Sequence, residues 1–407
     1  MHHLDLPTFL GVLAVMLGAA KLGALLAQWA GQPAVLGELA AGVVVGTSVL
    51  GLVDPRQETL HLLAELGVLI LLFEIGLETD LAQLLKVGGV SAMVAVVGVV
   101  LPFGLGYAAC RLLGQPPVVA TVAGAALTAT SVGITARVLA DLGRLQEPES
   151  RIILGAAVID DVVGLVILSV VTGLTEGREP TAAEVARITG LAVGFLAVAL
   201  VLGQWLVPPL FRLIGRIDLP GATPVMALLL ALGLGWAAIR VGSAHITGAF
   251  AAGLLLRRSG HVREIERGIA ALGHVLVPLF FVIVGAAVDV RVFNPFNPAN
   301  HSVLVGGGVL IAVAVAGKFA AGYAPFWFRG RKAVIGVGMI PRGEVGLIFA
   351  QAGLQQGVFD AGLFSAVTLM VMVTTFLAPP LLKALFPPRP GERPGQSKGV
   401  AELTGEV

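Results

Sequence analysis

Charged residues are scarce in this chain of 407 residues, and that scarcity argues against a soluble fold. Asp, Glu, Lys and Arg make up 13% of the sequence, whereas a soluble globular domain carries about 25%. Hydrophobic residues make up 57%, and there are 54 glycines. Glycine is frequent where membrane helices pack closely. The composition is therefore that of a membrane protein.

Cysteine is nearly absent as well. The single Cys110 excludes an internal disulfide and does not match any metal-ligand spacing. The net charge of +1 gives no reason to expect a nucleic-acid partner. The sequence also lacks an HExxH motif and a nucleophile–base constellation. We therefore expect neither an enzyme nor a bound cofactor.

Long apolar runs are what the sequence does contain. They are continuous rather than alternating, which excludes a membrane β-barrel and predicts an all-α polytopic protein. A membrane-spanning helix needs about 20 apolar residues. The first run is long enough to span and has no cleavage pattern after it, so we expect it to be retained. About thirteen helices are predicted, at 8–27, 34–53, 60–77, 86–113, 117–141, 150–174, 183–212, 221–239, 243–257, 264–288, 301–325, 332–357 and 361–386.

The distribution of Lys and Arg predicts the orientation of these helices. Cytoplasmic loops of membrane proteins carry an excess of Lys and Arg. One set of alternate loops is much richer in them, with Lys86, Arg144, Arg151, Arg212, Arg216, Arg257, Arg258, Arg263, Arg267, Arg329, Arg331 and Lys332. The chain is thus expected in the bacterial inner membrane, its N-terminus outside and its C-terminus cytoplasmic. The polar, proline-rich tail at 387–407 is predicted to be disordered.

Two predicted helices carry Gly, Ser, Thr or Pro at mid-span, which is typical of broken helices. One contains LTATSVGITARV and the other GMIPRGEVGLIFA. They are seven helices apart, an odd offset that places them in halves of opposite orientation. Such inverted repeats are common in secondary transporters, whose substrate site lies at the midplane between the repeats.

Three ionisable residues lie deep in apolar runs, where each needs a reason because burial of charge is costly. Asp160 and Asp161 lie in LGAAVIDDVVGL, about 15 Å along the helix from Arg151. Lys318 lies in VAVAGKFAAGY at a similar depth. Adjacent helical residues point about 100° apart, so one Asp can face Lys318 while the other faces a cavity.

This pattern indicates cation–proton exchange. Na⁺ is a hard cation that prefers oxygen ligands, and a desolvated carboxylate also binds protons readily. One site can then hold protons or the cation but not both, which suffices for antiport if the site opens alternately to each side. We take Asp160 and Asp161 as the Na⁺-binding acids, with Li⁺ or K⁺ as other candidate cations.

The broken helices supply further candidate groups. Unwound backbone at Thr130 and Ser131 offers carbonyl and hydroxyl oxygens, and half-helix ends carry partial charges. Arg342 and Glu344, beside the second break, are expected to pair with each other or with helix ends.

Four other charged residues are expected to have supporting or structural roles. Glu74 and Glu78 lie near the cytoplasmic end of the third helix, as interfacial residues or as a cation funnel. Glu38 is expected to make a packing hydrogen bond, and Arg137 to extend toward the interface.

Together these segments resemble the monovalent cation:proton antiporters of the second branch, the bacterial sodium/proton antiporter type. The resemblance covers nearly the whole chain and rests on the order and spacing of LLFEIGLE, TATSVGITARVL, AAVIDDVVGL, HITGAFAAGLLL, the Lys318 helix and IPRGEVGLI.

The resemblance implies roles for single residues. It implies that Asp161 binds the ion, that Asp160 pairs with Lys318, and that Thr130 and Ser131 lie in the crossed unwound stretch. The paired acids with Lys318 resemble the electrogenic members, which exchange two protons for one Na⁺.

The resemblance also implies a division of the chain and an elevator-type mechanism. It implies a homodimer, a moving core and a fixed scaffold. The expected parts are scaffold helices at 8–77 and 221–288, core helices at 86–174 and 301–386, and a linker helix at 183–212.

Two rival transport functions remain open. A potassium/proton antiporter would share the fold, although the tail lacks the GxGxxG of a nucleotide-binding domain. A sodium-coupled organic anion symporter would not need the Asp–Asp–Lys set.

Overall fold

The computed structural model describes residues 5–175, 181–214 and 221–386. Within these ranges the chain is helical, and strand-like pairing is limited to an isolated bridge between Gly46 and Val53. This confirms the predicted all-α fold. The predicted disordered tail at 387–407 lies outside the described residues.

The helices follow the predicted apolar runs. Nine helices of the described ranges are long and apolar enough to cross a membrane, and α2, α6 and α11 are shorter apolar helices. The α-helices are α1 Leu6–Trp29, α2 Ala34–Val45, α3 Glu58–Glu78, α4 Leu81–Lys86, α5 Gly88–Leu112, α6 Pro117–Ala126, α7 Val132–Asp141, α8 Pro148–Thr175, α9 Ala182–Ile214, α10 Ala222–Arg240, α11 His245–Leu256, α12 Val262–Ala286, α13 His301–Ala321, α14 Lys332–Gly338, α15 Gly343–Gln355 and α16 Ala361–Leu385.

Several predicted helices differ from the structure at their ends, among them the one predicted at 301–325, which ends at Ala321, and for two others the cause is local. The helix predicted at 34–53 ends at Val45, because Gly46 is extended and the chain folds back to pair with Val53. The helix predicted at 86–113 is preceded by a separate short helix, α4. The Asp80 carboxylate caps α4 by accepting hydrogen bonds from the amides of Ala82 and Gln83, which starts the helix there.

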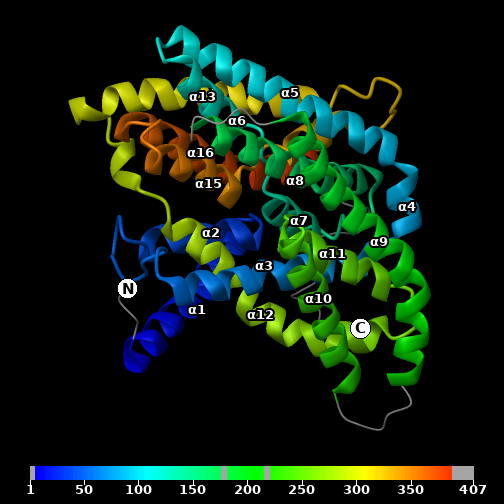
Figure 1. Cartoon of the computed structure of the whole chain (residues 1–407). Coiled ribbons are helices and arrows are strands. Elements are labelled where there is room, and N and C mark those ends of the chain that lie inside the picture. The colour runs from blue at the N-terminus through cyan, green and yellow to red at the C-terminus, as the bar shows by residue number, and fades with distance from the viewer. Residues whose placement is uncertain (1–4, 176–180, 215–220, 387–407) are drawn as a thin grey trace.

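The helices form two groups that lie one above the other in Figure 1. In the lower group, α1, α2 and α3 pack with α10, α11 and α12. In the upper group, α5, α6 and α8 pack with α13, α15 and α16. Helix α9 contacts α8 as well as α10 and α11, so it joins both groups.

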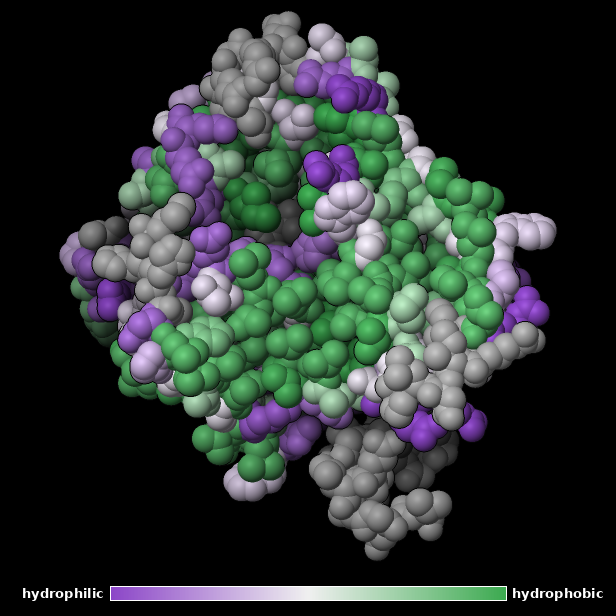
Figure 2. Space-filling model, turned by 60° about the horizontal axis from the view of Figure 1, so that its bottom comes forward, coloured by the Kyte–Doolittle hydropathy of each residue, from purple (hydrophilic) through white to green (hydrophobic). Residues whose placement is uncertain are grey.

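Glycine allows the closest of these contacts. A Cβ added at Gly253 of α11 would collide with the carbonyl oxygen of Phe73 on α3. The two backbones therefore touch, as is common where membrane helices associate. The face of the molecule in Figure 2 is largely apolar: hydrophobic residues cover a broad area of it, and hydrophilic ones gather mostly near its margins.

The two broken helices are present and cross each other. Between α6 and α7 the chain is non-helical at Ala129–Ser131, and between α14 and α15 at Ile340–Arg342. The amide of Ser131 donates to the carbonyl oxygen of Pro341 across the crossing, at 2.8 Å. The Thr135 hydroxyl donates to the carbonyl oxygen of Gly338 at 2.7 Å. These bonds satisfy backbone groups that the breaks would otherwise leave unpaired in a dry interior.

Candidate functional site

Asp160 of α8 is held by two side chains from other helices. The Lys318 ammonium of α13 donates to Asp160 Oδ2 at 2.9 Å, and both side chains are almost fully inaccessible. The Thr130 hydroxyl, at the first break, donates to the same oxygen at 2.5 Å. Asp160 Oδ1 has no hydrogen-bond partner among the described residues. Oδ2 of this carboxylate therefore accepts both hydrogen bonds.

Arg342 brings a second positive charge to the same region. Its side chain is fully buried and lies within electrostatic range of Asp160. Its guanidinium donates to the carbonyl oxygens of Met339, Ile340 and Ala314 at 3.1–3.3 Å. These carbonyls lie at the end of α14, in the second break and on α13. Arg342 thus binds the backbone at the end of α14 and in the second break, as well as one carbonyl within α13.

The structure does not describe the side chain of Glu344, so its expected pairing with Arg342 lies outside the described residues. The backbone at Glu344 belongs to the first turn of α15.

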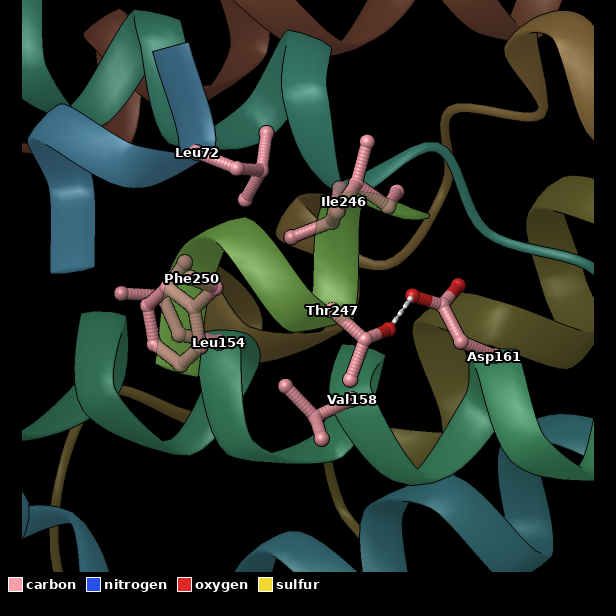
Figure 3. A pocket seen from close by; sticks show the side chains of 8 residues that line it. Leu72, Leu154, Val158, Asp161, Ile246, Thr247 and Phe250 are labelled. Carbon is pink, nitrogen blue, oxygen red and sulfur yellow. Dashed lines mark hydrogen bonds between the residues drawn. The ribbon is translucent and has the colours of Figure 1, made fainter. Parts of the chain in front are cut away.

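Asp161 points to a different environment. Figure 3 shows its carboxylate turned toward Thr247 of α11, whose hydroxyl donates to Asp161 Oδ2 at 3.3 Å. Asp161 is partly exposed, whereas Asp160 is 2% exposed. It lines a small pocket between α3, α7, α8 and α11, formed with Leu72, Val132, Leu154, Val158, Ile246, Thr247 and Phe250.

The two adjacent acids therefore differ in what they can do. Asp160 is paired with Lys318, and Arg342 lies within electrostatic range, so its charge is compensated in a dry interior. Asp161 combines carboxylate oxygens with a hydroxyl and an apolar pocket wall. Such a group can bind a proton or, through its oxygens, a hard monovalent cation.

The other predicted site residues lie near this centre or at its edge. Ser131 is buried, and its backbone holds the crossing together. Glu74 is partly buried and faces Gly273 of α12, away from the pocket. Glu78 is exposed at the last turn of α3, and its carbonyl oxygen accepts a bond from Gln146.

Sequence reasoning missed Thr247 as a site residue. It lies in HITGAFAAGLLL, but one threonine at the start of an apolar helix carries no signal of its own. Only the packing of α11 against the pocket brings its hydroxyl to Asp161. His245 Nε2, in the same helix, lies 2.9 Å from Glu65 Oε2 of α3, away from the ion-pair centre.

Comparison with known proteins agrees with this geometry. The transmembrane sodium/hydrogen exchanger family matches residues 13–386. The high-affinity Na⁺/H⁺ antiporter NhaS3 of Synechocystis is 40% identical, over 92% of this chain and 89% of the relative. A Na⁺/H⁺ antiporter of Enterococcus hirae is 31% identical, over 92% and 97%. The Na⁺/H⁺-K⁺ antiporter GerN of Bacillus cereus is 33% identical, over 92% and 95%.

A solved structure shares the fold. The sodium proton antiporter MjNhaP1 of Methanocaldococcus jannaschii matches with a TM-score of 0.66 and 18% identity, over 92% of this chain and 96% of that chain. The region that matches the family, residues 13–386, includes both broken helices, Asp160, Asp161 and Lys318. The chain is a multi-pass membrane protein that belongs to the sodium/hydrogen exchanger family.

Proposed function

We propose that the chain is a secondary active Na⁺/H⁺ antiporter in which protons and Na⁺ compete for Asp161. The observation that carries this proposal is that the two adjacent acids have different surroundings. Asp160 is committed to Lys318, whereas Asp161 lines a pocket and is partly exposed. Family membership and the printed names of the relatives support Na⁺ and protons as the exchanged ions.

Competition follows from electrostatics. A carboxylate in a poorly hydrated pocket is unstable as a bare anion, so it is occupied by a proton or by a cation. Na⁺ would take oxygens from Asp161 and Thr247, together with waters of its own shell. Binding of Na⁺ displaces the proton, and a proton displaces Na⁺.

The Lys318–Asp160 pair supplies a second proton in this proposal. A cation at Asp161 lies close to Asp160 and weakens its attraction for Lys318. The ammonium then releases its proton more easily, in a site where burial already disfavours charge. Exchange of two protons for one Na⁺ moves net charge, so we expect electrogenic transport driven by the inward proton gradient.

The two groups of helices suggest how the site changes sides. We assign residues 86–174 and 301–386 to a moving core, 8–77 and 221–288 to a scaffold, and 183–212 to the linker. Asp161 belongs to the core and Thr247 to the scaffold, so their hydrogen bond spans the boundary between them. Sliding of the core would break it, as an elevator mechanism requires. The scaffold would also form a homodimer.

We infer the side that the site faces from the residues that line the pocket. Val158 and Leu154 lie one and two turns from Asp161 toward the Pro148 end of α8. Phe250 lies one turn from Thr247 toward Leu256. Both directions lead to the ends rich in Arg, which we assign to the cytoplasm of a bacterial inner membrane, with the N-terminus outside. The structure then corresponds to an inward-facing state.

Potassium is the second candidate cation, because GerN carries K⁺ in its printed name. Purified protein in liposomes containing a pH dye distinguishes the candidates. A pulse of Na⁺, Li⁺ or K⁺ outside the liposomes should raise the internal pH only if that cation enters in exchange for internal protons. A response to Na⁺ but not K⁺ supports the proposal, and a response to K⁺ alone contradicts it. A response that changes with membrane potential tests electrogenicity.

A further inference from the structure

A second charge cluster, partly buried, lies where the half-helix α7 packs against α2 and α3. Its positive member is Arg137 of α7, whose Nε lies 3.1 Å from Asp141 Oδ1 one turn further along the same helix. The amide of Val35, in the first turn of α2, faces the Asp141 carboxylate. The free amides of a helix N-terminus attract negative charge. Asp141 therefore binds α7 to the start of α2.

Glu38 of α2 is the most deeply buried member of this cluster, in which Asp141 Oδ2 also lacks a hydrogen-bond partner among the described residues. Its side chain lies within electrostatic range of Arg137 and Asp141. The residue is 2% exposed, and its Oε2 has no hydrogen-bond partner in the described part of the chain. A buried carboxylate oxygen without a donor is costly, because it has lost its water and gained nothing in return.

The cluster contains more acid than base. Glu74 of α3 also acts on Arg137, so one guanidinium faces three carboxylates. The other charged groups around it lie further out: Lys21 on α1 faces Glu38, and Glu78 and Glu266 face Glu74. Lys383 of α16 lies beside Gly31, before the start of α2. The excess negative charge is least well accommodated at Glu38, the most deeply buried of the three carboxylates.

A proton is the ligand that suits this position. Among the residues that the structure describes, no group of three acidic, histidine or cysteine side chains has the spacing to hold a metal ion. A proton needs only one carboxyl group and adds no volume. Glu38 lies one turn from the start of α2, and Asp141 ends α7. This end of the bundle is the one with the Arg-rich loops, so protons would arrive from the cytoplasm.

We propose that Glu38 is a second proton-binding carboxyl, distinct from Asp161, whose charge sets how firmly α7 is held against α2. Ionised Glu38 attracts Arg137 and holds the half-helix in place. Protonated Glu38 leaves Arg137 to Asp141 and Glu74, and loosens the contact. Because α7 begins directly after Thr130 and Ser131, its position bears on Asp160. The effect on transport rests on the proposed antiport, whereas proton binding by Glu38 does not.

Infrared difference spectroscopy tests proton binding without transport. We would compare spectra at high and low pH in the Asp161→Asn variant, which removes the transport acid, and in D161N/E38Q. The carboxyl band assigned to Glu38 should be present in the first and missing from the second. The exposed Glu58, changed in D161N/E58Q, is the matched control and should leave that band unchanged. Identical spectra in D161N and D161N/E38Q would overturn the proposal.

A second variant covers the case in which E38Q does not fold. In D161N/R137Q the guanidinium that favours ionised Glu38 is gone. The same carboxyl band should then persist to a pH about one unit higher or more, the size of shift that a neighbouring Arg produces. A band that titrates at the same pH as in D161N would overturn the proposal.

Transport gives the functional readout. In liposomes, E38Q in the otherwise unchanged chain should shift or flatten the dependence of transport on internal pH, while KM for Na⁺ at the most favourable pH stays unchanged. An unaltered pH profile would contradict the coupling of Glu38 to transport. Absence of Na⁺-driven proton flux in the unchanged protein would instead contradict the proposed function.

Discussion

Lys318 Nζ and Asp160 Oδ2 lie 2.9 Å apart, with side chains 0% and 1% exposed. The next residue, Asp161, faces Thr247 and a pocket. One helical step thus separates a carboxylate held by an ammonium group from one that faces a hydroxyl group and a pocket. Four predictions follow from this arrangement and from the crossing beside it.

Lys318→Ala should lower the free energy of unfolding by about 3–5 kcal/mol, the usual result of leaving a buried charge without its partner. Thermal and denaturant unfolding in detergent measure the change. The exposed Lys86→Ala is the matched control and should stay within about 0.5 kcal/mol. The double variant D160N/K318A should recover part of the loss, because no buried charge is then left unpaired. A Lys318→Ala protein as stable as the parent would show that the pair is not formed in the folded protein.

Thr247→Val should raise KM for Na⁺ about tenfold, because it removes one of the two protein oxygens proposed to bind Na⁺, a loss comparable to that of a hydrogen bond to a charged group, worth ~1.4 kcal/mol or more. The substitution keeps the shape of the side chain and removes the hydroxyl that donates to Asp161. Thr247→Ser keeps the hydroxyl and is the control, with KM expected to stay within about twofold. Equal KM values in both variants would exclude Thr247 from the ion site.

Gly343→Ala should disrupt the crossing of the broken helices. Gly343 has φ +49°, and a Cβ there would collide with the Ser131 side chain. The strained backbone alone costs about 1 kcal/mol or more, and the collision adds to it. The same change at Gly11, which meets no atom within 4 Å in α1, is the control and should be neutral or slightly stabilising. Unfolding temperatures and Na⁺-dependent proton flux of the two variants provide the comparison, and equal values would contradict the crossing described above.

The sequence predicted the helices well because their signal is simple. An apolar run bounded by charges and prolines predicts a spanning helix whatever lies beside it, and all thirteen predicted runs correspond to helices. The predicted end of α2 was wrong because residues 46–53 are apolar too, although the chain folds back after Gly46. Hydropathy cannot distinguish an apolar turn from an apolar helix.

The site was predictable in part. Equal depth along two helices was enough to suggest that Asp160 and Lys318 meet. The sequence did not reveal which carboxylate oxygen each donor uses, nor that Arg342 binds the carbonyls of the second break. Thr247 and the Glu38–Arg137 cluster depend on helices far apart in the chain, and neither has a local pattern that marks it.

Asp161→Asn tests the proposed antiport most directly. We would reconstitute the variant in liposomes with a pH dye and apply a Na⁺ gradient, with Asp54→Asn, in a loop next to Arg56, as the matched control. Asparagine keeps the size of the side chain but cannot exchange a proton for a cation. We expect no Na⁺-dependent proton flux above that of protein-free liposomes, with unchanged folding and full flux in the control. Retained Na⁺-dependent flux in a folded Asp161→Asn protein would contradict the proposal.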